Sequence, residues 1–321
     1  MKIKDDFISV IIPLYNKGKL IIDTIESILA QSHQHFEIII VNDGSTDKSI
    51  EYVTPYTADS RVTLITQVNS GPGSARNTGV QKAKYSRVSF IDADDVWHTD
   101  FLSHAIQSLK SQSHSKCFFG TSTKIKKQLD HRYDNELSLF CFNDFRQSHF
   151  TCKSFKKRCD VSACTMVIDK EIFLEVGGFF DKERCLYGED SFLITTLFVN
   201  YPILLSKRPL LHVRTQPDGL GAQSKMKIVI RPLVEYQQLF LGKIGTANQS
   251  ILKDYVSYLT TLDSKKMSQK GIAIKSIKTL IKYSHLSSFL KADIIKNTLV
   301  IIINILLSPI LKIYKNVKDK F

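Results

Sequence analysis

Short apolar runs rich in β-branched residues alternate with segments of helical periodicity along the first third of the chain. The run from Ile8 to Asn16 predicts a strand buried on both faces, and residues 19–32 place isoleucines at the spacing of an amphipathic helix. The same alternation returns in "FEIIIVNDGSTD", "RVTLITQ", "GSARNTGVQKA" and "RVSFIDADD". This order predicts an α/β fold, a Rossmann-like and mostly parallel sheet with helices on both faces.

Polar side chains gather where three of these predicted strands end. They are Tyr15 and Asn16, the segment 42–47, and the segment 92–95. Ligands of open α/β sheets bind beyond the carboxyl ends of the strands. The pattern therefore predicts a nucleotide-type site at this edge of the sheet.

Three acids follow the apolar run "VSFI" within four positions: Asp92, Asp94 and Asp95. Burying such like charges unpaired would cost several kcal/mol, so water or a cation must compensate them. Strand alternation would place Asp92 and Asp94 on one side, with Asp95 pointing away or beginning the next turn. A hard divalent cation prefers such oxygen ligands, and the alternative is a solvated turn rich in aspartate.

Four motifs in order strengthen this interpretation: "SVIIPLYNKGKLIIDTIESILAQSHQHFEIIIVNDGSTDKS", "GPGSARNTGV", "FIDADDVW" and "GEDSFL". Together they resemble the family 2 glycosyltransferases of the GT-A fold, over about the first 220 residues. The resemblance implies transfer of a sugar from a nucleotide diphosphate donor, usually UDP-linked, with inversion at the anomeric carbon. It also implies a divalent metal, Mn²⁺ or Mg²⁺, because the leaving diphosphate needs positive charge where its own charge develops.

The resemblance assigns the donor side of the site. It makes Asp94 the metal ligand, and Asp92 a contact to the ribose or a support of the metal. Asp43 would accept a hydrogen bond from N3 of uracil. Pro13 and Tyr15 would line the same pocket, although an aromatic side chain such as Tyr15 is also common in plain packing.

Further donor contacts are expected from the glycine-rich motif and from the segment after the last predicted strand. Gly71 and Gly73 allow close backbone approach, and Arg76 at a helix start suits a nucleotide or phosphate. Arg214 is expected at the diphosphate. His212 is a weaker metal or phosphate candidate, since a lone histidine is more often structural.

The acceptor side is expected around "GED". By resemblance, Asp190 is the general base that takes the proton of the acceptor hydroxyl, and Glu189 orients or contacts the acceptor. Acids at a helix N-terminus are also common as caps. Trp97, the only tryptophan, is a candidate platform for stacking on a sugar, with a core anchor as the alternative.

The charge divides the chain. The net charge is +13, with 27 Lys+Arg against 26 Asp+Glu in residues 1–221 and 17 against 5 in residues 222–321. We expect a GT-A domain over 1–221, with a nucleotide-binding half (1–100) and an acceptor-binding half (101–221). Residues 222–321 are expected to form a basic, mainly helical extension.

The end of this extension predicts contact with an anionic membrane surface. Ile274, Ile277 and Ile281 interleave with lysines in an amphipathic pattern, and residues 297–311 carry no charge. Because a spanning helix needs roughly 20 apolar residues, an interfacial segment is favoured over a core helix or a true span. The interleaved isoleucines favour lipid over nucleic acid as the partner.

The cellular setting follows from the N-terminus and the cysteines. The apolar run at the start is broken by Pro13 and no cleavage site follows, so no signal peptide is predicted. The six cysteines match no zinc or redox spacing and are expected to be reduced thiols. We expect a cytoplasmic protein that is peripheral on the inner face of the cell membrane.

The combined prediction is an inverting glycosyltransferase. It would use a UDP-sugar and a glycan or lipid-linked glycan acceptor, in bacterial surface polysaccharide synthesis (capsule, exopolysaccharide or lipopolysaccharide). One alternative is a sugar nucleotidyltransferase, which would be expected to carry a signature rich in Gly, Arg and Lys after the first strand, where "PLYNKGKL" stands. The other is a non-catalytic scaffold of a glycan-assembly complex.

Overall fold

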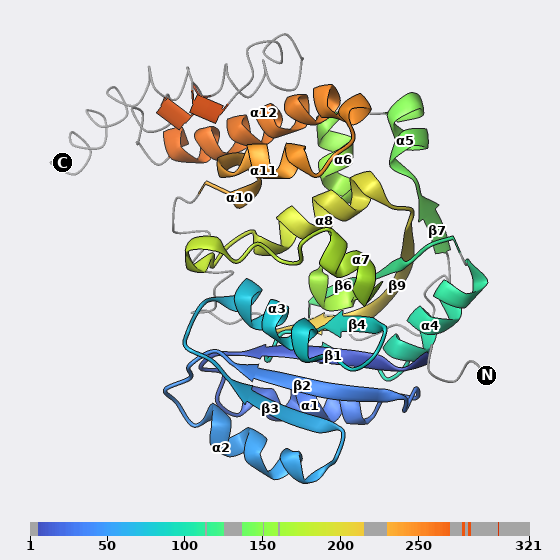
Figure 1. Cartoon of the computed structure of the whole chain (residues 1–321), viewed down its shortest axis with the longest axis vertical. Helices are drawn as coiled ribbons and strands as arrows, with labels where there is room; N and C mark the ends of the chain where they lie inside the picture. The colour runs from blue at the N-terminus through green and yellow to red at the C-terminus, as the bar shows by residue number, and fades with distance from the viewer. Residues whose placement is uncertain are drawn as a thin grey trace, which may run out of the picture. The chain divides into compact units, whose positions relative to one another are not determined.

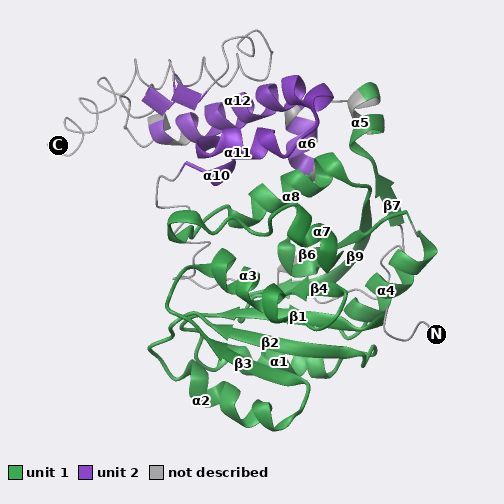
Figure 2. Cartoon of the chain, in the orientation of Figure 1, with its two compact units in different colours: residues 1–149, 158–219 green, residues 150–157, 220–321 purple. Residues whose placement is uncertain are grey.

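The computed structural model divides into two compact units, residues 1–149 with 158–219 and residues 150–157 with 220–321 (Figure 2). The residues that it describes are 6–112, 114–124, 137–149, 151–159, 161–214, 230–269, 278–279, 282–283 and 301. Residues 215–224 lie outside these ranges, as does nearly all of the predicted amphipathic and uncharged tail. Among the described helices, none has the length and apolar character that crossing a membrane requires.

A mixed sheet forms the centre of the first unit (Figure 1). Its strand order is β3-β2-β1-β4-β8-β6-β9-β5, and β7 pairs with β9. The strands are β1 (Ile8–Leu14), β2 (Phe36–Asn42), β3 (Val62–Thr66), β4 (Arg87–Phe90), β5 (Val96–Trp97), β6 (Cys117–Lys124), β7 (Leu137–Phe140), β8 (Met166–Asp169) and β9 (Ile203–Val213). The pairs β3-β2, β2-β1 and β1-β4 are parallel, whereas β8 is antiparallel to both β4 and β6.

Helices cover both faces of this sheet, as the alternation of side chains along β1 shows. Val10 and Ile12 belong to one apolar cluster with buried isoleucines of α1 (Leu20–Leu29). Ile11 points to the opposite face, where it fills the space beside Gly79 of α3 (Pro72–Lys82) and leaves no room for a Cβ atom there. The α/β class predicted from the sequence is confirmed.

The other helices of the first unit follow the order expected for this class. They are α2 (Ser49–Val53), α4 (Phe101–Ser111), α5 (Phe142–His149), α7 (Lys170–Glu175) and α8 (Glu189–Asn200). The helix α4 packs on β6 and β9, and α3 lies against β1 and β2. The carboxyl ends of β1, β2 and β4 are thereby left for the loops that carry the polar motifs.

The second unit is helical, in agreement with the predicted helical C-terminal region. Its described helices are α6 (Cys152–Arg158), α10 (Pro232–Glu235), α11 (Gln237–Gly242) and α12 (Thr246–Gln269). Both α10 and α11 pack on α12. Within this unit the rings of Phe155 and Tyr255 meet edge to face at 4.8 Å, and Arg231 pairs with the buried Asp263 at 2.7 Å.

Candidate functional site

The acidic motif forms a turn, because β4 ends at Phe90 before the first aspartate. The amide of Asp95 donates to the carbonyl of Asp92 at 3.0 Å, which closes the turn. As a result, carboxylate oxygens of Asp92 and Asp95 and the thiol of Cys164 lie within 4.8 Å of one another. Asp95 therefore belongs to the cluster, contrary to the expectation from strand alternation, which holds only while the backbone stays extended.

Arg76 lies at the centre of the site and links its two sides. Its side chain is buried on α3, with Nη2 donating to Asp92 Oδ1 at 2.6 Å and Nη1 donating to Glu189 Oε1 at 2.8 Å. Burial disfavours its charge, yet Asp92 and Glu189 hold the pKa of Arg76 above its ordinary value. The guanidinium also lies over the ring of Phe179, 4.9 Å from its centroid. The predicted phosphate ligand is thus a buried bridge between two carboxylates.

The acids of the turn lie where burial opposes their negative charge. Burial, together with the charges of Asp92 and Asp94, raises the pKa of Asp95 to about 8. Burial also raises the pKa of Asp94, against the opposing effect of Lys17. Burial opposes ionisation of Asp92 as well, but Arg76 outweighs it and lowers the pKa of that carboxyl. A bound cation would stabilise the ionised forms of Asp94 and Asp95, so this arrangement favours cation binding.

The donor atoms of this cluster fit a hard divalent cation. Asp92, Asp94 and Asp95 offer carboxylate oxygens, which Mg²⁺ and Mn²⁺ prefer. The thiol of Cys164 does not compete as a ligand, because burial and the nearby Asp92 raise its pKa well above the ordinary value and keep it protonated. A hard cation would therefore meet oxygen donors only.

The "GED" motif begins helix α8 and places Asp190 in its first turn. One carboxylate oxygen of Asp190 accepts from the amide of Ser191 at 2.7 Å. Burial and the neighbouring Glu189, opposed by Arg76, raise the pKa of Asp190 to about 6. A carboxyl group that ionises near neutral pH is suited to general base catalysis.

Asp43 holds the loop that leads into α3 through hydrogen bonds. It is 3% exposed, and its oxygens accept from the amides of Ser70 and Gly71 at 2.8 and 2.9 Å. The side chain of Gln67 donates to it as well, at 2.8 Å. A carboxylate has about four acceptor positions, so three of those of Asp43 are used by the protein itself.

The remaining residues of the predicted nucleotide pocket lie beside this loop or on α3. Pro13 is half-buried in β1, opposite Val41 of β2, and Tyr15 is 43% exposed just beyond the strand. Gly73 allows close packing, because a Cβ atom there would lie 2.5 Å from the carbonyl oxygen of Phe180. Its role in the structure is the contact between α3 and the segment before α8.

Trp97 does not have the exposed face that a sugar platform needs. Its side chain is 3% exposed, its ring lies 4.3 Å from that of Phe101, and Nε1 donates to the carbonyl of Cys164 at 2.7 Å. The indole is a core anchor with a satisfied polar atom. The predicted stacking role of Trp97 is therefore not supported, and the core alternative describes this residue.

The two basic candidates on the last strand are held in different ways. The amide of Arg214 donates to Asp95 Oδ1 at 3.1 Å, which ties the end of β9 to the acidic turn. Its guanidinium pairs with Asp23 of α1 at 2.6 Å. His212 pairs with Val96 in the sheet, and burial lowers the pKa of its imidazole.

Two members of the site were not expected from the sequence. Lys17 donates to Asp94 Oδ2 at 2.6 Å, and the thiol of Cys164 lies within 4.8 Å of carboxylate oxygens of Asp92 and Asp95. A lysine two positions after Tyr15, at the end of a predicted strand, was a usable signal for Lys17. Cys164 reaches the turn through the antiparallel pairing of β8 with β4, for which the sequence gives no local signal.

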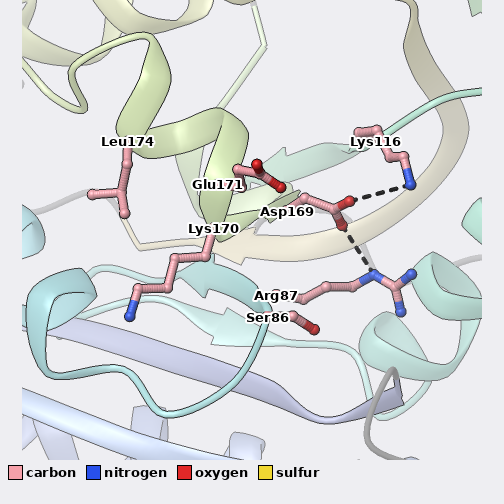
Figure 3. A pocket seen from close by; sticks show the side chains of 7 residues that line it. All are labelled: Ser86, Arg87, Lys116, Asp169, Lys170, Glu171 and Leu174. Atoms are coloured by element: carbon pink, nitrogen blue, oxygen red, sulfur yellow. Dashed lines mark hydrogen bonds and ion pairs between the residues drawn. The ribbon is translucent and has the colours of Figure 1, made fainter. Parts of the chain in front are cut away.

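A separate pocket of about 550 Å³ lies at the amino end of β4 (Figure 3). There Asp169 lies between two cations, Arg87 at 3.3 Å and Lys116 at 3.5 Å. The side chains of Lys170 and Leu174 also line this pocket. It shares no residue with the acidic turn at the other end of the strand and is not part of the candidate site.

Comparison with known proteins identifies the family. A family model described as glycosyl transferase family 2 matches residues 9–177. A putative teichuronic acid biosynthesis glycosyltransferase of Bacillus subtilis is 38% identical over 117 residues, 36% of this chain and 46% of that protein. An uncharacterized glycosyltransferase of Rickettsia prowazekii is 25% identical over 250 residues, 73% of this chain and 70% of that protein. Three other rickettsial glycosyltransferases are matched over only 14%, 24% and 25% of their length.

Solved structures show the same fold. Staphylococcus aureus TarS 1–349 in complex with UDP-GlcNAc superposes with a TM-score of 0.60 at 17% identity, covering 93% of this chain and 81% of that one. The same fragment in complex with UDP gives a TM-score of 0.52 at 17% identity, over 86% and 88% of the two chains. The GT-A fold predicted from the sequence is confirmed.

Proposed function

Since the chain belongs to glycosyl transferase family 2, we propose that it transfers a sugar from a UDP-linked donor to a glycan or lipid-linked glycan acceptor, with inversion. The observation that carries the proposal is that Arg76 bonds both Asp92 of the acidic turn and Glu189, the neighbour of Asp190 in the "GED" motif. The acids of the turn suit a metal and diphosphate, and Asp190 suits an acceptor hydroxyl. That TarS is solved with UDP-GlcNAc supports the choice of a UDP-sugar.

On the donor side, Asp94 and Asp92 would hold a divalent cation, Mn²⁺ or Mg²⁺, and Asp95 completes the acidic turn. When bound, the cation supplies positive charge for the departing diphosphate. Asp43 keeps one acceptor position for N3–H of uracil, and the exposed ring of Tyr15 lies at the end of the neighbouring strand. Pro13 lines the same pocket.

The loops that flank the phosphates add further contacts. Gly71 gives its amide to Asp43 and so shapes the loop before α3. Arg214 is a candidate for the diphosphate, because its ion pair with Asp23 is half-exposed and thus weak enough to exchange. His212 stays a weaker candidate for the metal or a phosphate. Arg76 acts through the two carboxylates that it holds, Asp92 and Glu189.

On the acceptor side, Asp190 takes the proton of the attacking hydroxyl. The hydroxyl oxygen forms the new bond to the anomeric carbon from the face opposite UDP, while the bond from that carbon to the diphosphate oxygen breaks. Glu189 is fixed by Arg76 and orients the acceptor next to the base. Because Asp190 has a pKa near 6, it is ionised at neutral pH and regains a proton readily from the hydroxyl.

The acceptor class is proposed from the relatives and from the charge of the tail. One relative is named for teichuronic acid biosynthesis, a surface polysaccharide. The GT-A domain over 1–221 is followed by a stretch with 17 basic against 5 acidic residues, which suits a peripheral position on an anionic inner membrane surface. We infer a role in bacterial surface polysaccharide synthesis on a lipid-linked acceptor.

The test is a screen of UDP-sugars with Mn²⁺, first for slow UDP release and then with candidate lipid-linked acceptors added. We expect one UDP-sugar to give UDP release that a chelator abolishes and Mn²⁺ restores. Release of pyrophosphate in place of UDP would support the nucleotidyltransferase alternative. UDP binding without turnover on any donor and acceptor would support the scaffold.

Membrane attachment is tested by sedimentation with anionic vesicles at low and high salt. The full-length protein should bind at low salt and be partly released at high salt, since salt screens the lysines. A full-length protein that stays wholly in the supernatant at low salt would contradict the peripheral assignment.

A further inference from the structure

Lys17 forms an ion pair with the carboxylate proposed to bind the metal. It lies in the loop between β1 and α1, and its Nζ is 2.6 Å from Asp94 Oδ2. The pair is mostly enclosed, with side chains 22% and 13% exposed. An ion pair that is screened so little by water holds its partners firmly.

The backbone around Lys17 is fixed by the neighbouring loop. The amide of Lys17 donates to Ser49 Oγ at 2.9 Å, and the amide of Gly18 donates to Asp47 Oδ2 at 2.9 Å. Asn16, in the left-handed region at φ 48°, accepts from the amide of Thr46 at 2.8 Å. The fixed backbone therefore directs the side chain of Lys17 toward the acidic turn. Only its flexible four-carbon side chain can move.

The ammonium and a divalent cation compete for Asp94. An oxygen that accepts from an ammonium at 2.6 Å cannot at once give its full charge to a metal, and the two cations repel each other at this range. Asp94 has a second carboxylate oxygen, yet the repulsion between the two cations favours a metal that binds once the ammonium has moved away. The diphosphate of the donor binds together with the metal, and its negative charge offers the ammonium a new partner.

We propose that Lys17 is a positioning residue that holds Asp94 until the divalent cation binds and then moves its ammonium onto the diphosphate. The proposal rests on the proposed function, because it concerns the same metal and donor. The ion pair between Lys17 and Asp94 weakens binding of the metal when no nucleotide is present. Binding of the metal is coupled to binding of the nucleotide, because only the diphosphate gives the displaced ammonium a new partner. Lys17 thereby links occupancy of the metal site to the presence of donor.

The experiment compares Lys17→Met with wild type in two direct binding measurements. Binding of Mn²⁺ alone, followed by the paramagnetic signal of the free ion, should be about tenfold tighter in Lys17→Met, because the competing cation is gone. Binding of UDP in saturating Mn²⁺, followed by calorimetry, should be about tenfold weaker, because the diphosphate loses a cation. The coupling between Mn²⁺ and UDP should fall accordingly.

Two further variants serve as controls. Lys48→Met removes a lysine that is 72% exposed in the next loop and should change neither affinity. Lys17→Arg keeps the positive charge and should restore most of the UDP affinity. In an Asp94→Asn background, Lys17→Met should no longer tighten Mn²⁺ binding, which ties the effect to this pair.

An unchanged Mn²⁺ affinity in Lys17→Met, with the thermal unfolding transition preserved, would overturn the proposal even if UDP binding weakened. This result is distinct from failure of the proposed function. If wild type bound neither Mn²⁺ nor UDP, the donor assignment itself would fall, and the role of Lys17 would fall with it.

Discussion

The two ends of strand β4 both carry charged side chains, yet their charges are balanced differently. At the amino end, Asp169 lies between Arg87 and Lys116. At the carboxyl end, Lys17 and Arg76 pair with Asp94 and Asp92, while Asp95 is raised in pKa to about 8. Partly exposed ion pairs such as those at the amino end are common in structural roles. A buried carboxyl group whose ionisation the protein opposes, such as Asp95, is a feature of functional sites.

The largest effect should come from Asp190→Asn at the carboxyl end. The amide keeps the shape of the side chain but cannot take a proton, so we expect sugar transfer to fall by about 10³- to 10⁴-fold. UDP affinity and the unfolding transition should be unchanged. The measurement is the rate of acceptor-dependent UDP release, with Glu171→Gln at the amino end as the matched control. Turnover within tenfold of wild type would remove the base assignment.

Removal of Arg76 should have the next largest effect, on stability. Arg76→Met leaves the buried Glu189 and the partly exposed Asp92 without their cation, which should lower the free energy of unfolding by about 3 kcal/mol. The corresponding change at the amino end, Arg87→Met, leaves Asp169 with Lys116 and should cost less than about 1 kcal/mol. Denaturant unfolding measures both, and equal losses would show that the two ends do not differ as described.

The pH dependence of turnover should be a smaller and graded effect. A raised pKa means that Asp190 gains its proton already near pH 6, and only the ionised form can act as base. The turnover rate should therefore fall about tenfold per pH unit below 6 and level off above 7. The residual activity of Asp190→Asn should not show this fall in rate below pH 6. A flat wild-type profile between pH 5 and 7 would argue against Asp190 as the base.

The smallest effect is expected from Asp169→Asn at the amino end. Its ion pairs with Arg87 and Lys116 are partly exposed, and such pairs contribute about 0 to 1 kcal/mol. Turnover and UDP affinity should match wild type. A loss of transfer greater than about tenfold would show that the pocket in Figure 3 belongs to the working site.

The sequence was most informative where structure is decided locally. The apolar run that forms β1 and the helical spacing of α1 identify their elements to within three residues at either end. The antiparallel β8 was harder to predict, because its place between β4 and β6 depends on pairing with strands far away in the chain. Local pattern fixes an element, whereas its neighbours are decided by long-range packing.

The same distinction applies to the candidate site. The motifs located Asp92 and Asp190, which Arg76 and Glu189 bring together. Alternation misplaced Asp95, because the sequence does not reveal that the strand stops before the acids. The contact of Lys17 with Asp94 spans 77 positions, so the sequence shows a lysine at the end of the first strand but not the carboxylate that it reaches.

Gly73 determines how closely the donor and acceptor parts of the site can approach. Its hydrogen faces the carbonyl of Phe180, and a methyl group there would also come within 3.4 Å of the side chain of Glu189. Any larger residue would push α3, which carries Arg76, away from the segment that carries Asp190, the proposed base. The separation between the proposed donor site and the proposed base is thus set by the absence of one carbon atom, and it is held by backbone contacts rather than by adjustable side chains.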